Sequence, residues 1–515
     1  MAARASASGS GSGSAARLAA RARDGIARRV RVDARALAAV RAGLGGLVLV
    51  DLWLRSRDLV AFYTDAGALP RALLAERFPA LARLSVHALG GGGWFQGALF
   101  VIAGAAALAL VAGYRTTLAA VVTWLLVVSL HARNPVLLNG GDSLLRRLLL
   151  WSLFLPLGER WSVDALRRER APRAGVASLA TGAFLLQVVL VYATNAVFKL
   201  RGSTWTPPGA DAMAYVFGLD RLTVRLGDVL AAYPALYEPL GHLWLVLIVA
   251  SPLLVLATGR TRTLLAGALI CMHLGMALTM RLGVFPLVSV TGLVPFLPGR
   301  VWDAVETGGR AGLARAREAL GASGTLAGWR ARLARSEPAT LPESVARARE
   351  RAVPVVVAGL LVAVLVWNGM ALGYVEPPAG TPPAADPVNY RWDMFAPSPP
   401  RADVWFVAPA RTASGERVDA LGGGRVRWQP PPDVADAYPS TRWMIYLLDL
   451  RRAQYASLRP ALAEYLCDRY ARRHGERLER VAVDAVIRPT FVDEPGPAPI
   501  RRTRLVERRC RTSRG

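Results

Sequence analysis

Lysine is almost absent from this chain: of its 63 lysine and arginine residues, only Lys199 is a lysine. Arginine keeps its charge under nearly all conditions, whereas a lysine amine that is taken out of water can give up its proton and act as a base. Lys199 lies near the end of the apolar run LQVVLVYATNAVFKL, which begins at Leu186. The alternative interpretation is a lysine whose ammonium reaches the membrane–water interface and has no chemical role. The contrast with arginine makes Lys199 our candidate catalytic base.

Cysteine and histidine are also scarce. The chain has 3 cysteines, too few for a disulfide scaffold or a thiolate zinc site. Its 5 histidines include no HxxxH pair, so their spacing predicts no metal site. We therefore expect chemistry that does not depend on a bound metal.

Acidic residues are few, which leaves a formal charge of +26, and 53% of the residues are hydrophobic. A chain this apolar is not an ordinary soluble protein. The arginines lie mainly in short runs beside apolar segments, as in membrane topology signals, and not along one face that could follow a phosphate backbone. This distribution argues against a nucleic-acid partner and for a lipid bilayer.

Apolar runs of spanning or near-spanning length indicate a polytopic α-helical membrane protein with about nine membrane helices. They cover 37–54, 94–113, 116–131, 143–157, 175–198, 237–257, 263–280, 283–297 and 353–374. The segments 58–85 and 208–234 mix apolar residues with Arg and Asp, which indicates amphipathic helices on the membrane or across the end of the bundle. Residues 1–35 form a basic tail, rich in Ala, Gly, Ser and Arg, that we expect to be disordered and cytoplasmic.

Arginine also predicts the orientation of the helices. The connections 158–174, 258–262 and 298–352 are rich in arginine, and the last carries ten of them, whereas the connection 132–142 holds only Arg133. The positive-inside rule then places the N-terminus in the cytoplasm and Lys199 near the outer face of the cytoplasmic (inner) membrane.

The composition divides the chain into five parts. The tail 1–35 is followed by a transmembrane domain at 36–300, an arginine-rich cytoplasmic connection at 301–352, a last transmembrane helix at 353–374 and an extracytoplasmic domain at 375–515.

Alternating runs such as DVWFVAP, GRVRWQP, LERVAVDAVIRPTF and RRTRLVERR predict strands in the last part, and 441–473 predicts a helix, so this domain is expected to be α+β. Outside the cytoplasm Cys467 and Cys510 could form a disulfide, and free thiols are an equal alternative.

Several polar residues accompany Lys199 as site candidates. Asn139 and Asp142 belong to a polar turn, NGGD, that opens a helix. Its simplest role is to cap that helix, and its functional role would be to hold a polar ring substituent of a substrate. His273, inside an apolar helix, is either a neutral histidine bonded to a neighbouring helix or a proton relay. Trp161, Trp205 and Trp244 fit an ordinary interfacial aromatic belt.

Three motifs together resemble the HTTM family, the membrane domain shared with vitamin K-dependent γ-glutamyl carboxylases. They are RNP…NGGDSLLR…LFLPLGERWSVDAL, VYATNAVFKLRGSTW and RWDMFAPSPPR. The resemblance covers about 37–300 well, and 391–515 resembles the C-terminal part of bacterial HTTM proteins. It implies that Lys199 is the base that deprotonates a vitamin K-type hydroquinone (menaquinol in a bacterium), with Tyr192 and Asn195 from the same helix, Asn139 and Asp142 binding the substrate. The carboxylase loop ahead of WSVD carries an Asn-His pair, where this chain has Asn139-Gly140-Gly141-Asp142.

Two functions therefore remain open. The first is a membrane enzyme of the carboxylase-like class (epoxidase, carboxylase or lyase) that uses Lys199 as a base on a quinol or lipid-like substrate. The second is a non-catalytic anchor or maturation factor that presents the outer domain to an exported peptide or envelope protein. Transport is weaker because no discontinuous-helix repeat or chain of acidic residues crosses the membrane midplane.

Overall fold

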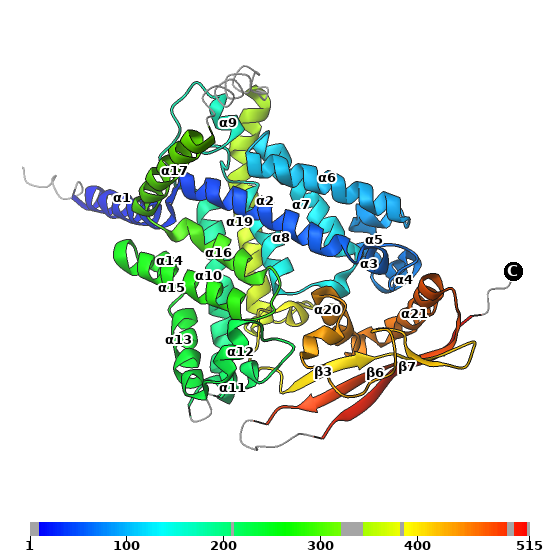
Figure 1. Ribbon diagram of the computed structural model, residues 1–515. Coiled ribbons are helices and arrows are strands. Elements are labelled where there is room, and N and C mark those ends of the chain that lie inside the picture. The colour runs from blue at the N-terminus through cyan, green and yellow to red at the C-terminus, as the bar shows by residue number, and fades with distance from the viewer. Residues whose placement is uncertain (1–9, 208–210, 321–342, 382–385, 492–498, 512–515) are drawn as a thin grey trace, which may run out of the picture.

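The computed structural model describes residues 10–207, 211–320, 343–381, 386–491 and 499–511. Most of the described chain is helical, and a strand-containing region follows at the C-terminal end (Figure 1).

Six helices in the described residues are long and apolar enough to cross a membrane. They are α2 (Ala34–Ser56), α6 (Gly93–Ala112), α7 (Thr116–Arg133), α10 (Leu179–Leu200), α15 (Gly259–Thr279) and α19 (Glu343–Ala371, with its apolar part at Ala346–Ala371). These helices are consistent with a membrane location.

The count of nine spanning helices is not confirmed, because three expected spans form shorter helices. They are α8 (Gly140–Ser152), α13 (Tyr237–Val249) and α16 (Phe285–Leu293). Proline accounts for part of the difference. Pro252 separates α13 from the short α14 (Leu253–Leu256), and Pro295 lies in the 3-10 turn that follows α16. Proline removes a backbone donor and crowds the preceding turn, so a long apolar run does not stay one helix there.

The basic tail is not entirely disordered, contrary to expectation. Residues 1–9 lie outside the described residues, but α1 (Ser10–Val30) is a helix. Alanine and arginine are strong helix formers, which favours this outcome once the helix end is held. Its last turn is held by Arg29, whose Nε donates to the carbonyl of Leu256 at 2.8 Å, and by Arg262, which donates to the carbonyl of Arg29 at 2.7 Å.

The arginine-rich connections gather at one end of the molecule. The two-residue strands β1 (Val32–Asp33) and β2 (Gly175–Val176) pair with each other. Helices α9 (Val163–Leu166) and α17 (Gly299–Leu320) lie towards the same end of the molecule (Figure 1). Arg35, at the start of α2, connects α2 to α17 through an ion pair with Asp303 at 2.7 Å. Residues 321–342 of the same connection lie outside the described residues. The helices α20 and α21 and the C-terminal sheet lie at the opposite end of the molecule (Figure 1).

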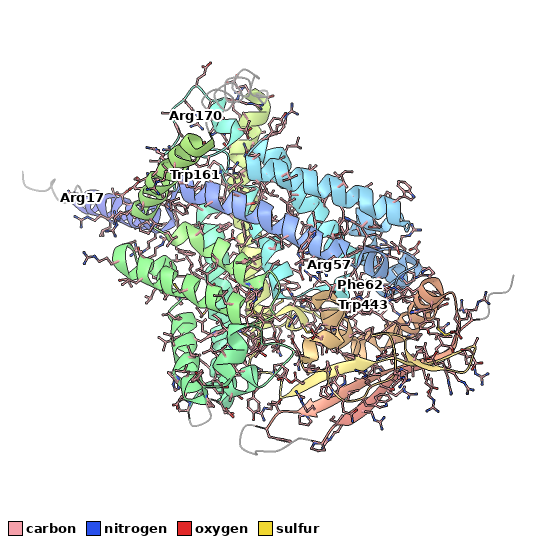
Figure 2. All side chains as sticks on the ribbon, viewed as in Figure 1. Arg17, Arg57, Phe62, Trp161, Arg170 and Trp443 are labelled. Carbon is pink, nitrogen blue, oxygen red and sulfur yellow. A yellow bond between two sulfur atoms is a disulfide. The ribbon has the colours of Figure 1, made fainter. Side chains whose placement is uncertain are left out.

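Short helices cover that opposite end. Within 58–85 the structure has α3 (Leu59–Tyr63), α4 (Arg71–Arg77) and α5 (Pro79–Leu84), and within 208–234 it has α11 (Ala212–Phe217) and α12 (Leu226–Ala231). The rings of Phe62 and Trp443 lie 4.8 Å apart between centroids, so α3 packs directly on the C-terminal region (Figure 2).

The C-terminal region is an antiparallel sheet with two helices, α20 (Thr441–Leu450) and α21 (Arg459–His474), on the side that faces the bundle. Strand β6 (Leu478–Pro489) is its centre. Strands β3 (Ala402–Val407) and β4 (Pro409–Thr412) pair end to end along β6, β7 (Arg501–Arg509) also pairs with it, and β5 (Arg417–Asp419) extends β4. The run GRVRWQP, expected as a strand, has no regular structure.

Cys467 of α21 and Cys510, which follows β7, form a disulfide, so the disulfide alternative holds and the free-thiol alternative does not. Cys271 is a free, exposed cysteine. The disulfide fixes the helix to the end of the sheet and suits an oxidising compartment.

Replacing Cys467 and Cys510 together by serine is expected to lower the stability of the C-terminal region by roughly 2–4 kcal/mol, because the unfolded chain gains freedom. Cys271→Ser is the matched control, since that thiol is free and exposed. Urea titration of the purified full chain, followed by protease cleavage of the C-terminal region, measures the difference. Equal midpoints for the double variant and the control would contradict it.

Candidate functional site

Lys199 lies in the last turn of α10 and is fully buried, with 0% of its surface exposed. Ser178 begins this helix with a capping box that fixes its start, and the turn Ser203–Trp205 folds back after its end. Within the described part of the chain the Lys199 amine has no hydrogen-bond partner. It lies 3.0 Å from the ring centroid of Trp205 and 5.6 Å from that of Trp244. The faces of aromatic rings carry partial negative charge, so these two indoles can attract the amine when it is protonated.

Asn195, one turn before Lys199, does not present a free amide. Its Nδ2 donates to the carbonyls of Trp392 at 3.1 Å and Met394 at 3.2 Å. The two amide hydrogens are therefore used to hold the chain segment that carries RWDMF. In this conformation Asn195 Nδ2 makes a structural contact, and the substrate contact expected at Asn195 stays a prediction.

Tyr192 and His273 form a second group deeper along α10. Tyr192 lies seven residues before Lys199, which is about 10 Å along a helix. Its ring centroid is 5.7 Å from that of His273, which in turn lies 5.9 Å from Phe285. The Nδ1 atom of His273 donates to the carbonyl of Leu269 at 2.9 Å, a bond within its own helix. This bond fixes the tautomer and leaves the other ring nitrogen facing away from the helix backbone.

Asn139 begins α8 as its N-cap. Its side-chain oxygen accepts from the backbone amides of Gly141 at 2.8 Å and Asp142 at 3.1 Å, and the Asp142 carboxylate accepts from the Asn139 amide at 2.9 Å. This reciprocal arrangement is a capping box, which satisfies otherwise unpaired amides at the helix start. The helix-capping interpretation of the NGGD turn thus accounts for Asn139.

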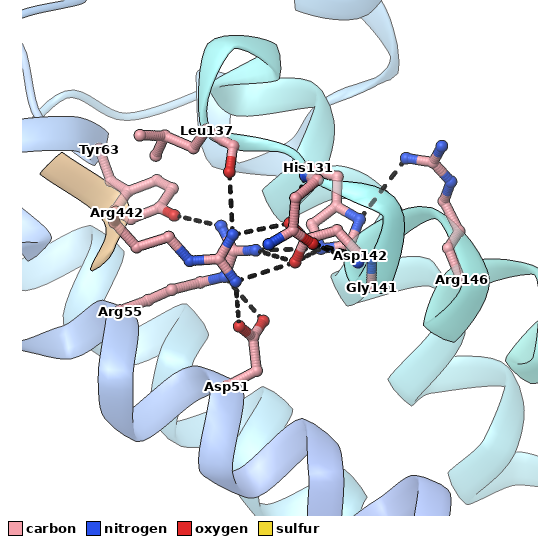
Figure 3. A network of polar contacts seen from close by, with 10 residues as sticks. Asp51, Arg55, Tyr63, His131, Leu137, Gly141, Asp142, Arg146 and Arg442 are labelled. Carbon is pink, nitrogen blue, oxygen red and sulfur yellow. Dashed lines mark hydrogen bonds and ion pairs between the residues drawn. The ribbon is translucent and has the colours of Figure 1, made fainter. Parts of the chain in front are cut away.

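Asp142 has a second task, which the sequence did not indicate. It lies in a buried cluster with Asp51 and Arg55 of α2 and Arg442 of α20 (Figure 3). We call these four residues the ion cluster. Asp142 accepts a hydrogen bond from Arg55 at 2.6 Å and hydrogen bonds from both terminal nitrogens of Arg442, at 2.6 and 2.9 Å. Two carboxylates and two guanidiniums balance in charge.

Asp51 closes the ion cluster from the other side. It accepts from Arg55 at 2.7 Å and from Arg442 at 2.6 Å. Two further hydrogen bonds support the cluster: Arg55 donates to the hydroxyl of Tyr63 and Arg442 to the carbonyl of Leu137. Buried ion pairs are tolerated when their hydrogen bonds are satisfied in this way.

The electrostatics of Asp142 follow from these contacts. Burial alone would raise the pKa of its carboxyl, but Arg442 and Arg55 outweigh burial and hold the pKa well below its usual range. Asp142 is therefore an ionised structural carboxylate. Arg146, four residues further along the helix, lies 3.5 Å from His131 Nδ1.

Ligand atoms of Asp51, His131 and Asp142 lie within 4.8 Å of one another, a spacing that could suit a metal ion. The carboxylate oxygens, however, already accept from Arg55 and Arg442, and His131 Nε2 lies 3.4 Å from Arg55. A metal cation would have to displace two guanidiniums from the same oxygens, so the donor set fits the arginines and not a metal.

Sequence reasoning missed two features of this region. Trp205, assigned to the aromatic belt, lies over the Lys199 amine, and nothing in its spacing signals that contact. The second missed feature is the ion cluster. Its residues Asp51 and Arg55 could have been recognised, since they lie four residues apart at the end of an apolar run, where charges are rare. Their partner Arg442 could not, because it lies hundreds of residues further along the chain.

No protein-family model, no curated protein and no solved structure matches this chain.

Replacing Arg442 by alanine is expected to destabilise the contact between the C-terminal region and the bundle by about 3–5 kcal/mol, because two buried carboxylates lose a partner. Arg452→Ala is the matched control. The Arg452 side chain is 64% exposed and pairs with Asp449 at 3.3 Å, so its loss should cost at most about 1 kcal/mol. Limited proteolysis of the full chain in urea reports both values, and similar losses for the two variants would show that the ion cluster does not hold the regions together.

Proposed function

We propose that this protein is an integral membrane enzyme in which Lys199 acts as a base on a quinol or lipid-like substrate, with chemistry related to that of the vitamin K-dependent carboxylases. The observation that carries the proposal is the amine itself, which is fully buried and has no hydrogen-bond partner within the described residues. A buried polar group without a partner is uncommon in folded proteins and marks a functional candidate.

The surroundings of the amine suit a flat, apolar ring. Trp205 and Trp244 supply two indole surfaces beside it. Menaquinol would supply a phenolic hydroxyl, and the neutral Lys199 amine would accept its proton. Tyr192 and His273, about two turns deeper, would contact the rest of such a substrate, with His273 as the candidate proton relay.

The orientation in the membrane is part of the proposal. The arginine-rich connections lie at one end of the molecule and the C-terminal region at the other, which agrees with a cytoplasmic N-terminus and an extracytoplasmic C-terminal domain. The Cys467–Cys510 disulfide supports the same placement. Lys199 then lies towards the outer face, and the lipid bilayer is the source of the substrate.

One observation favours the alternative, a non-catalytic anchor or maturation factor with an exported peptide or envelope protein as its partner. Three candidates for substrate binding make structural bonds with part or all of their side-chain polar atoms: Asn139 through Oδ1, Asp142 through both oxygens and Asn195 through Nδ2. A protein whose role is to hold its outer domain firmly would show such bonds.

The test compares wild type, Lys199→Arg and the reverse exchange Arg201→Lys in membranes supplied with reduced menaquinone or a vitamin K-type hydroquinone under air. Arginine keeps the charge but cannot act as a base, so Lys199→Arg is expected to lower hydroquinone consumption at least about 100-fold. Arg201 is exposed and two residues away, and its exchange should leave the rate unchanged.

Chromatographic quantification of the oxidised product measures these rates, and formation of the Cys467–Cys510 disulfide verifies that each variant folds. Equal turnover by wild type and Lys199→Arg, or turnover by neither, would overturn the enzymatic proposal in favour of the anchor.

A further inference from the structure

Residues 391–398, RWDMFAPS, cross the end of α10 next to Lys199, and we call this segment the strap. We propose that the strap is a positioning element: it fixes the Trp205 indole over the Lys199 amine and separates that amine from water. The catalytic meaning of this inference rests on the proposed function, but the covering of the amine can be tested without turnover.

The first contact of the strap is with Asn195. This side chain lies on the same face of α10 as Lys199, one turn earlier, and both of its N–H donors bond strap carbonyls. Removing the amide would leave the carbonyls of Trp392 and Met394 without these partners, which weakens a buried contact by more than the loss of one exposed bond. Asn195 is thus a positioning residue.

The second contact is with Trp205. Its Nε1 donates to the carbonyl of Phe395 at 2.9 Å, while its ring face lies against the Lys199 amine. Phe395 has a φ of 61°, a left-handed conformation that is unfavourable for a bulky residue. Such a conformation persists only where surrounding contacts impose it, and it is concentrated at functional sites. The strap therefore fixes the ring that touches the amine.

The third contact is with the turn after α10. A Cβ atom at Gly202 would lie 2.5 Å from the carbonyl oxygen of Pro397, closer than non-bonded atoms allow. The hydroxyls of Thr204, in this turn, and Ser398, in the strap, form a hydrogen bond of 2.7 Å. The strap can lie this close to the turn after α10 because Gly202 has no side chain. Gly202→Ala is therefore expected to displace the strap from the turn.

The composition of the chain supplies a direct readout, because Lys199 is its single lysine. We would treat the full-length protein in detergent micelles with an acetylating amine reagent and follow acetylation of Lys199 by peptide mass spectrometry, which separates it from the N-terminal amine. The variants are Gly202→Ala, Asn195→Ala and the milder Ser398→Ala. Gly267→Ala, where an added Cβ meets nothing within 4 Å, is the matched control.

Wild type and Gly267→Ala are expected to react slowly and at the same rate. Gly202→Ala and Asn195→Ala should react at least about tenfold faster, and Ser398→Ala by a smaller factor, because reaction of a buried group requires local opening. Wild-type labelling rates in all three strap variants would overturn the inference, as would a wild type that labels as fast as an exposed amine. Ser398→Ala removes only one hydroxyl, so it keeps the test decisive if a larger change prevents folding.

A positioning role also predicts how activity changes. Asn195→Ala should lower kcat of hydroquinone consumption about tenfold with KM nearly unchanged, since the substrate surface remains while the amine is misplaced. Trp205→Phe, which keeps the ring face but loses the bond to Phe395, should retain more activity than Trp205→Ala. If no variant shows turnover but the labelling pattern holds, the proposed function fails and the covering strap stands.

Discussion

A buried pairing of two carboxylates with two guanidiniums constrains the whole molecule. Asp51 and Arg55 belong to the first membrane-length helix, Asp142 to the start of α8 and Arg442 to the C-terminal region. None of these charges could remain in the interior alone, because an isolated buried ion is far more costly than a paired one. The C-terminal region must therefore dock on the bundle for the bundle itself to be stable. This makes the region a structural part of the helical bundle and not a separate unit on a linker.

The ion cluster also shows by contrast what is unusual about Lys199. Arg55 is as deeply buried, yet it bonds two carboxylates and a hydroxyl. Within the described residues the Lys199 amine has no hydrogen-bond partner and lies against the Trp205 ring, whereas each guanidinium nitrogen of Arg55 has an acceptor. Arginine suits the paired position because its planar fork reaches several acceptors at once and keeps its charge. A lysine at the unpaired position can exchange a proton, which is what the proposed function requires of Lys199.

The sequence predicted those features that depend on local pattern. Helix α10, the C-terminal strands β6 and β7 and the helical stretch before them follow hydrophobic periodicity and turn residues, and they occur where we expected them. Helix lengths were less predictable, because prolines such as Pro252 divide apolar runs that look continuous. The NGGD turn was correctly given a capping role as one alternative. Its engagement with Arg442 was not, since a contact across 300 residues leaves no local signal.

Three motifs suggested the family resemblance. The contacts of the strap give a physical reason why these motifs occur together in one chain. Asn195 and Trp205, from the motif around Lys199, bond the strap, which is itself the third motif. The NGGD turn of the first motif meets the same segment, because a Cβ at Gly140 would lie 3.4 Å from Met394 Sδ. A change in any one of the three would disturb the other two through these contacts. Two of the three motifs thus contact one short segment directly through Asn195 and Trp205, and the first approaches it through Gly140, whereas Asn139 and Asp142 hold the start of α8 and the ion cluster.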